Sequence, residues 1–315
     1  MENKETKKGE KSMRVETTER YINPYTDFGF KKLFGTELNK DLLISFLNAL
    51  LNGEQEITDL THLNGEHLGD GYGDRRAVFD VYCQLADGKK FIVEMQKAEQ
   101  EYFKDRSVYY ATTPIRQQAV KGKWDYHLEN VYTIGILNFV FPDGEYPDDS
   151  YRHEIKLKDV EDNHVFYDKL TFIYLEMPKF NKTEDELETL FDKWMFVLQN
   201  LYRLLERPKA LQDRVFQKVF EQAEIARYSD AERWEYEESR KMFWDNYSVM
   251  KTAMNKGIKQ GLEEGIKQGI KQGIKQGAQQ AKAEAARRFH ALGLSVEQIA
   301  QGVDLPVDEV KKLLQ

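Results

Sequence analysis

Two acidic residues stand on neighbouring β-prone runs of the chain, in a spacing suited to binding a metal ion. Asp80 and Glu94 lie in the runs 78–85 and 90–96, on either side of Ala86-Asp87-Gly88. A three-residue loop that ends in glycine is a favoured hairpin connection, and it pairs residue 80 with residue 94. Paired residues have Cβ atoms about 5 Å apart. Two carboxylates at that separation repel each other, and a hard divalent cation with oxygen ligands commonly relieves the repulsion.

Gln96 extends this arrangement, because it lies two residues beyond Glu94 and points to the same face of the strand. A metal held by Asp80 and Glu94 would lower the pKa of bound water and stabilise charge on a scissile phosphate, while Gln96 positions the nucleophile. A neutral amide cannot act as a general base, so removal of the proton would fall to the metal and bulk solvent, or to a second metal. An ordinary polar hairpin face is the alternative interpretation.

The same register pairs residue 85 with 89 and residue 78 with 96, and it assigns the remaining side chains to two faces. The apolar face is expected to carry Phe79, Val81, Cys83, Leu85, Phe91, Val93 and Met95. Asp80, Glu94 and Gln96 then lie on the opposite face.

Helical patterns flank the hairpin. Apolar residues at three- and four-residue steps predict two helical pieces over 27–51, broken near Gly35-Thr36. A second helical stretch is expected over 99–122, with Pro114 kinking it or starting a new turn. Its candidate buried residues are Phe103, Val108, Tyr109, Ile115 and Val120.

A run over 131–141 is apolar on both faces, as in a central strand covered by helices. Further strands are expected at 151–158 and 170–177. This order of helices and strands predicts an α/β fold built on a mixed sheet. After Pro178 the pattern is helical throughout.

The tail from 257 onward repeats the tetrapeptide Gly-Ile-Lys-Gln. Its four-residue period exceeds 3.6, so each column of residues drifts about 40° per repeat around a helix. Each Gly costs about 1 kcal/mol relative to Ala, which favours either a helix held by a partner or a flexible basic linker. Residues 251–291 contain nine Lys and Arg against three Glu, a local charge of +6.

Composition limits the function classes only loosely. The 315 residues carry a net charge of −8, so no global positive field draws the chain to nucleic acid. The single Cys83 excludes an intramolecular disulfide and a Cys-based zinc site, and it suits a reducing, cytoplasmic setting. No apolar run approaches the roughly 20 residues of a membrane span, and the polar N-terminus suggests neither a signal peptide nor an anchor, so no membrane partner is expected.

Several ordered blocks of the sequence resemble the Rpn family of recombination-promoting nucleases and transposases, within the PD-(D/E)xK nuclease superfamily. The matching blocks are Asn23–Gly35, Phe79–Tyr82, Ile92–Gln96, Arg106–Tyr110 and Val131–Leu137. Family members commonly carry a proline before the third strand, where this chain has Glu129-Asn130. The resemblance covers about residues 21–250.

This resemblance implies a restriction-endonuclease-like fold and a DNA endonuclease that uses Mg²⁺ or another divalent cation such as Mn²⁺, in a recombination or mobile-element setting. Asp80 and Glu94 match the metal-binding acids, and Gln96 replaces the usual catalytic Lys. Asp27 is the candidate third acid, with a helix N-cap as its alternative role. The candidate phosphate contacts are Lys31, Lys32 and Arg106. A non-catalytic DNA-binding or assembly protein that keeps the nuclease fold is the rival interpretation.

The predicted organisation has five parts. They are a disordered tail over 1–19, a nuclease-like α/β domain over 20–180, a helical extension over 181–250, the repeat segment over 251–291 and a two-helix tail over 292–315. Ser295 with Gln298 fits a capping box for the first tail helix, and Pro306 suits the first turn of the second.

The two-helix tail over 292–315 resembles the helix-turn-helix pieces of DNA-binding proteins, but we expect it to bind proteins or to oligomerise in preference to reading a DNA groove. Asp308 and Glu309 at the start of its second helix would repel phosphate. Gly and Ile at i, i+4 spacing would let helices of two subunits approach, so a homo-oligomer is expected. Met250 and Met254, just before the repeats, suggest an internally translated C-terminal fragment as a further partner.

Overall fold

A computed structural model describes residues 19–54, 56–67, 77–119, 122, 124–142, 146–147 and 149–314. The predicted disordered tail, apart from Glu19, and the predicted buried residue Val120 lie outside these ranges. The chain divides into two compact units, of which the first ends at Asp245 and the second begins at Asn246.

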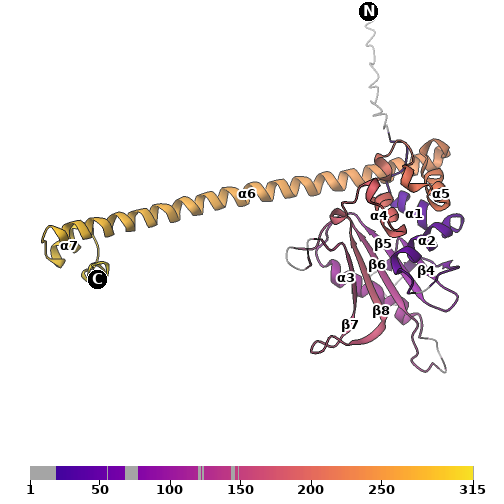
Figure 1. Ribbon diagram of the computed structural model, residues 1–315, viewed down its shortest axis with the longest axis horizontal. Coiled ribbons are helices and arrows are strands. Elements are labelled where there is room, and N and C mark those ends of the chain that lie inside the picture. Colours follow the sequence, from indigo (N-terminus) through magenta and orange to yellow (C-terminus); the bar gives the residue numbers. More distant parts are fainter. Residues whose placement is uncertain are drawn as a thin grey trace, which may run out of the picture. The chain divides into compact units, whose positions relative to one another are not determined.

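The described residues form a mixed α/β structure, as predicted (Figure 1). The strands are β1 Thr61–His62, β2 Glu66–His67, β3 Ala77–Val78, β4 Val81–Gln84, β5 Lys90–Gln96, β6 Val131–Leu137, β7 Arg152–Lys158 and β8 Val165–Glu176. The α-helices are α1 Asp27–Phe34, α2 Lys40–Leu51, α3 Phe103–Arg116, α4 Leu190–Asn200, α5 Arg214–Ala223, α6 Asp230–Ala291, α7 Val296–Val303 and α8 Val307–Leu313. Short 3₁₀ turns occur at Glu37–Asn39, Met177–Lys179, Glu184–Glu186, Leu201–Arg203, Lys209–Leu211 and Ile225–Arg227.

Six strands form one sheet in the order β1-β4-β5-β6-β8-β7, while β2 pairs with β3 in a separate ladder. The β5–β6 and β6–β8 pairs are parallel, and the other pairs of the large sheet are antiparallel. Every residue of β6 is buried, which confirms the central strand predicted from its apolar faces. This strand ends at Leu137, four residues earlier than the apolar run predicted.

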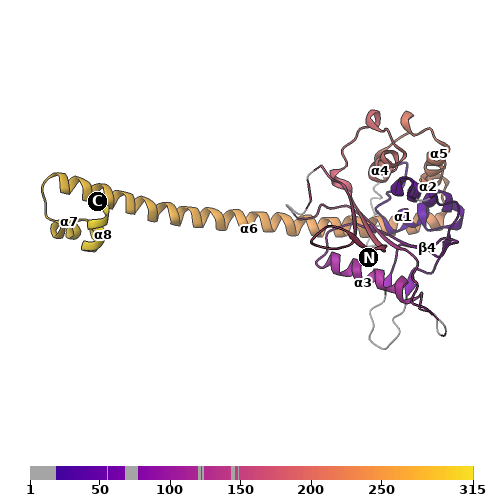
Figure 2. The same cartoon turned by 60° about the horizontal axis from the view of Figure 1, so that its bottom comes forward.

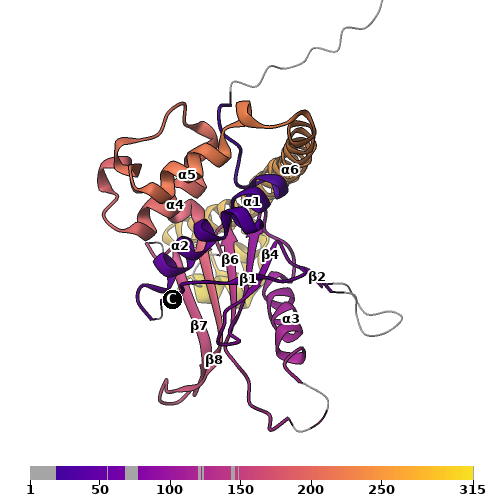
Figure 3. The ribbon, with the colours of Figure 1, turned by 90° about the vertical axis from the view of Figure 1, so that its right-hand side faces the viewer.

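Helices cover both faces of the sheet. Figure 3 shows α3 on one face, and α1, α2, α4 and α5 on the other. The main hydrophobic core fills the second side, where Phe34, Phe46 and Trp194 pack against Val93 and Ile134 of the sheet. Residues 181–243 therefore contribute helices to the same core as the α/β elements.

The β4–β5 hairpin has the predicted register, with Val81 opposite Val93 and Gln84 opposite Lys90. Leu85 donates its N–H to the carbonyl of Lys89 at 2.9 Å, which closes the predicted loop. The backbone at Gly88 has φ of +90°, the left-handed conformation that this loop requires.

One end of this hairpin is corrected by the structure, because the predicted first strand does not run through Phe79 and Asp80. The chain bends at Asp80, and the N–H of Phe79 donates to the carbonyl of Gly65. Ala77–Val78 then pairs with β2, so residue 78 does not pair with Gln96. Phe79 leaves the main core and packs beside Tyr82 on the α3 face.

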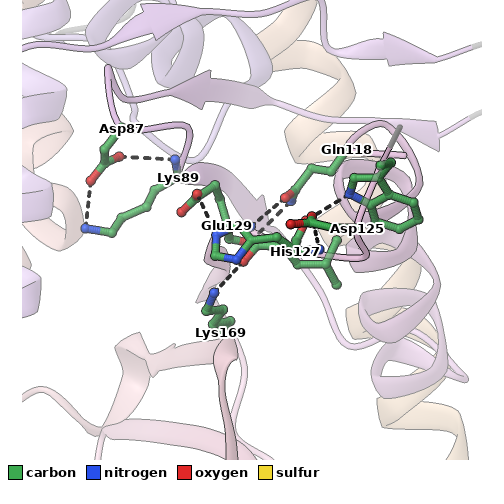
Figure 4. Close-up of polar contacts among 9 residues, drawn as sticks. Asp87, Lys89, Gln118, Asp125, His127, Glu129 and Lys169 are labelled. Atoms are coloured by element: carbon green, nitrogen blue, oxygen red, sulfur yellow. Dashed lines mark hydrogen bonds and ion pairs between the residues drawn. The ribbon is translucent and has the colours of Figure 1, made fainter. Parts of the chain in front are cut away.

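The turn of the hairpin lies beside the loop that joins α3 to β6 (Figure 4). Asp87 accepts the backbone N–H of Lys89, and its carboxylate also pairs with the Lys89 ammonium at 2.7 Å. Gln118 binds both backbone groups of Glu129, accepting its N–H at 2.6 Å and donating to its carbonyl at 3.3 Å. A proline at residue 129 would lack that N–H and could not make this hydrogen bond. The loop of this chain is therefore held by a contact that a loop with proline at this residue would not have. The nearby Lys169 ammonium donates to the carbonyl of Leu128 at 2.7 Å.

In the second unit, the end of α6 packs with α7 and α8 around a small core (Figure 2). The predicted capping box is present, with Ser295 and Gln298 each bonding the other's backbone N–H. Pro306 is the N-cap of α8, one residue before the helix begins. The Gly-Ile-Lys-Gln repeats are helical throughout, as part of α6.

Candidate active site

The hairpin brings Asp80, Glu94 and Gln96 together at the carboxyl end of β5. Asp80 donates its backbone N–H to Oε1 of Glu94 at 3.2 Å, and its own Oδ2 accepts the N–H of Met95 at 2.8 Å. Gln96 donates from Nε2 to Oε2 of Glu94 at 3.3 Å. Hydrogen bonds therefore orient both carboxylates, and the amide of Gln96 holds the second oxygen of Glu94.

Both carboxylates are electrostatically unfavourable as anions. Glu94 is only 7% exposed, and burial raises its pKa, with the negative charge on Asp80 raising it further. Burial also raises the pKa of Asp80, although the hydrogen bond from the N–H of Met95 opposes this shift. A cation shared by the two groups would reverse both effects.

Helix α3 lies over this pair. Its residues Arg106 and Tyr110 line the same pocket as Glu94 and Gln96. The Arg106 guanidinium stands 5.2 Å from the centroid of the Tyr110 ring and also donates to Gln100. Arg106 is therefore the predicted phosphate contact that the fold brings to the carboxylates.

The buried face of α3 differs from the one predicted. It consists of Phe103, Ser107, Ala111 and Pro114, whereas Val108 is 54% exposed and Tyr109 is 45% exposed. The prediction followed hydrophobicity, but the surface beneath α3 is partly polar and favours small side chains. The helix continues through Pro114 and ends two residues later, at Arg116.

Asp27 is the first residue of α1 and does not cap it. The N-cap is Thr26, whose Oγ1 accepts the N–H of Gly29 at 3.0 Å. Asp27 instead forms an exposed ion pair with Lys31 at 3.1 Å. Its charge raises the pKa of Asp80, so the two acids lie within electrostatic range of each other.

Asp27, Lys31 and Lys32 do not line the pocket of Glu94 and Gln96, although the charges of Asp27 and Lys31 act on Asp80. Among the described residues, no three His, Cys, Asp or Glu side chains are arranged to hold a metal ion, so Asp27 does not complete a three-acid group with Asp80 and Glu94. Lys32 pairs with Glu232 of α6 at 2.6 Å. Lys31 is engaged by Asp27, as described above.

A second layer of polar residues, which the sequence did not reveal, lies beside the carboxylates. The sheet register aligns Glu94, Gly135 and Tyr174 on β5, β6 and β8. The Tyr174 ring fills the space above Gly135, and its hydroxyl lies 2.6 Å from Oγ of Ser107 on α3. Thr133, 3% exposed, lines the same pocket with its Oγ1 lacking a hydrogen-bond partner among the described residues.

The sequence signal for this layer was indirect. Gly135 interrupts an apolar central strand, which is typical of a close approach by another group. The partner that approaches comes from residue 174, too far along the chain to be identified without the fold.

A family model for PD-(D/E)XK nuclease family transposases matches residues 24–253. This chain belongs to that family. The matched region contains the hairpin, the three predicted catalytic residues and α3. No curated protein and no solved structure matches the chain. Within the described part of the chain, no helix is both long enough and apolar enough to cross a membrane.

The donor atoms at the site fit a hard divalent cation. Two carboxylates converge there, and Mg²⁺ is commonly bound through one or two carboxylates, with waters and substrate phosphates completing its shell. Burial raises the pKa of both Asp80 and Glu94, although Lys31 and Lys97 act against the shift at Asp80 and Arg106 acts against the shift at Glu94. Asp80 and Glu94 would hold the ion, and Gln96 is bonded to one of them.

Proposed function

We propose that this protein is a Mg²⁺-dependent DNA endonuclease that hydrolyses phosphodiester bonds in a recombination or mobile-element setting. The observation that carries the proposal is the hydrogen-bonded pair of Asp80 and Glu94, with Gln96 beside it, in a member of a nuclease family. Mn²⁺ is an alternative ion of the same coordination chemistry. The lone buried thiol of Cys83 and a DNA substrate fit a cytoplasmic protein.

Each side chain has a distinct role in this proposal. Asp80 and Glu94 hold the cation, which lowers the pKa of bound water and stabilises charge on the scissile phosphate. Gln96 orients the attacking water by hydrogen bonding, but its amide cannot take the proton. Arg106 contacts the phosphate in this proposal, which is supported by its position in the lining of the same pocket as Glu94. Asp27 stays a candidate outer acid, acting on Asp80 through its charge.

Plasmid cleavage by the purified full-length protein tests the proposal. We expect cutting with Mg²⁺, none with EDTA, and a loss of at least about 100-fold in Asp80→Asn and Glu94→Gln, since charge stabilisation of this kind contributes several kcal/mol. Asp87→Asn, at the turn of the same hairpin, is the matched control and should retain activity. Cutting that survives both site substitutions would refute the assignment.

The second candidate is a non-catalytic DNA-binding or assembly protein that keeps the nuclease fold. Two observations favour it: Gln96 supplies no base, and Glu94 is almost wholly buried. Its expected result is DNA binding without cleavage on supercoiled, linear or single-stranded DNA, with Mg²⁺ and with Mn²⁺. Metal-dependent cutting of any of these substrates would exclude it.

We also propose that the repeat segment joins two copies of the chain. Its apolar residues are more than half exposed, and a Cβ added at any repeat glycine would meet no atom of the described structure within 4 Å beyond the backbone of α6 itself, so a second helix can approach. The exposed apolar residues are Ile258, Leu262, Ile266, Ile270 and Ile274. Light scattering should give the mass of a dimer or larger, and of a monomer when these residues are replaced by Ser.

An internally translated fragment that starts at Met250 or Met254 would carry the same repeats and could pair with the full-length chain. Immunoblotting of a C-terminally tagged gene should show a short second product. That product should vanish when both Met codons are replaced, and its absence from the unmodified gene would contradict the proposal.

A further inference from the structure

The positive charge of the chain is concentrated in its second unit. Residues 246–315 carry eleven Lys and Arg against seven Asp and Glu, a net charge of +4, whereas residues 1–245 carry 35 against 47, a net charge of −12. From Gly265 to Ala283 there are four lysines and no acidic residue. A nuclease whose first unit repels a polyanion needs a positive surface elsewhere in order to retain DNA.

The lysines of the second unit gather on one side of α6. A helix turns about 100° per residue, so Lys256, Lys267, Lys271, Lys275 and Lys282 fall within a sector of about 100°. We call these five residues the lysine stripe. At 1.5 Å per residue it is about 39 Å long. Figure 2 shows α6 as an unbroken helix through this segment.

Four of the five lysines in the stripe are available for binding, because Lys282 is engaged by the carbonyl and the carboxylate of Asp304. Lys256, Lys267, Lys271 and Lys275 are exposed, and within the described structure none of them forms a hydrogen bond or ion pair. Lys282 donates to the carbonyl of Asp304 at 2.7 Å and anchors the end of the stripe. The same sector contains one acidic residue, Glu264, before the acid-free segment begins.

We infer that the lysine stripe binds the phosphate backbone of DNA and tethers the substrate, independently of base sequence. This inference rests on the proposed function only in taking DNA as the substrate. Lysine ammonium groups bind phosphates as point charges. Lys267, Lys271 and Lys275 recur in identical repeats, about 6 Å apart along the helix axis, and this regular spacing suits a regular polyanion. Contacts to phosphates do not distinguish one base from another, so the stripe would bind DNA of any sequence.

Pairing of two chains through Ile258 and Leu262 leaves the stripe free, whereas Ile274 lies within the sector of the stripe. Ile258 and Leu262 lie on the side of α6 roughly opposite the stripe, because they are displaced from it by about 150° to 170° around the axis. A second helix on that side would leave Lys267, Lys271 and Lys275 facing solvent. A paired tail would then present one stripe from each copy.

The experiment measures binding of the full-length protein to a fluorescent DNA duplex by anisotropy, in EDTA and over a range of salt concentrations. The test variant replaces Lys267, Lys271 and Lys275 with Gln, which has a similar helix propensity. Because each phosphate contact contributes about 0.9 to the slope of log K against log salt, we expect the slope to fall by up to about 2.7. The loss should be the same for duplexes of different sequence.

Two control variants isolate charge from position. Replacing the same three lysines with Arg should preserve affinity and slope. Replacing Lys251 and Lys259 with Gln, on other sides of the same helix, should leave most of the binding intact. Circular dichroism checks that the helix content is unchanged.

An unchanged slope in the Lys267, Lys271 and Lys275 variant would overturn the inference, and so would a wild-type protein that binds phosphatidylserine vesicles but not DNA. The nuclease proposal is tested separately by plasmid cleavage. Metal-dependent cutting with an unchanged slope would refute the tether alone, and a reduced slope without any cutting would refute the nuclease alone.

Discussion

Replacing Gly135 with alanine tests whether the polar layer beneath α3 is as tightly packed as the structure indicates. A Cβ at residue 135 would lie 2.9 Å from Cδ1 of Tyr174 and 3.2 Å from Cδ2 of Leu137. The tyrosine cannot move away freely, because its hydroxyl is 2.6 Å from Oγ of Ser107. Any shift of the ring is therefore transmitted to α3, which carries Arg106 over Glu94.

The magnitude follows from two opposing contributions. Overpacking of a tight interior costs about 1–3 kcal/mol. Replacing glycine with alanine also lowers the conformational entropy of the unfolded chain, which stabilises the folded state by about 0.4–1 kcal/mol. We expect Gly135→Ala to lower the free energy of unfolding by about 1–2 kcal/mol, measured by urea denaturation followed by tryptophan fluorescence.

A matched substitution elsewhere should have the opposite sign. A Cβ added at Gly269 of α6 would have no described atom within 4 Å other than its own helix backbone. Gly269→Ala should therefore stabilise the helix by about 1 kcal/mol, seen as a higher melting temperature in far-UV circular dichroism. An unfolding free energy of Gly135→Ala within about 0.5 kcal/mol of wild type would refute the packing argument, because changes of that size are typical of surface sites.

Three further outcomes are expected. Tyr174→Phe should cost about 0.5–1.5 kcal/mol in urea denaturation by removing a buried hydrogen bond, and an unchanged stability would mean that the bond contributes nothing. Mg²⁺ should raise the melting temperature of the wild-type protein but not that of Asp80→Asn. At a Mg²⁺ concentration of 100 times Kd, the expected gain in the free energy of unfolding is about 2.7 kcal/mol. Equal shifts in both proteins would show that the ion binds elsewhere. Glu232, whose pKa is lowered to about 2 chiefly by Lys32, should contribute stability that is complete above about pH 4.5 and is lost as pH falls toward 2. The difference between wild type and Glu232→Gln, expected to be below about 1 kcal/mol for this partly exposed pair, should therefore shrink over that range.

The hairpin shows how far local rules reach. Its turn, its register and the facing of Glu94 and Gln96 followed from the glycine at residue 88 and the alternation of side chains. These rules failed at Phe79, because a contact with Gly65 redirects the chain there. The segment that contains Gly65 lies outside the hairpin, so the residue pattern of the hairpin alone does not predict this contact.

The orientation of α3 shows the limit of the hydrophobic pattern. Val108 and Tyr109 are the more apolar choices for its inner face, yet Ser107 and Ala111 occupy it. The surface that these residues contact includes Tyr174 and Glu94. It has room for small side chains, and the Tyr174 hydroxyl forms a hydrogen bond with the hydroxyl of Ser107. The chemistry of the opposing surface decided which side of α3 is buried.

Local patterns in the chain were enough to predict the shared face of Glu94 and Gln96 on the hairpin, the central strand, and the columns of lysine and isoleucine in the repeats. All of these depend on turn chemistry and periodicity, which act over a few residues. The folded structure was needed to find that Arg106 and Tyr110 join the carboxylates, that Lys32 is bound to α6, and that Tyr174 lies over Gly135. Those contacts join segments far apart in the chain, and packing of the complete sheet and its helices selects them.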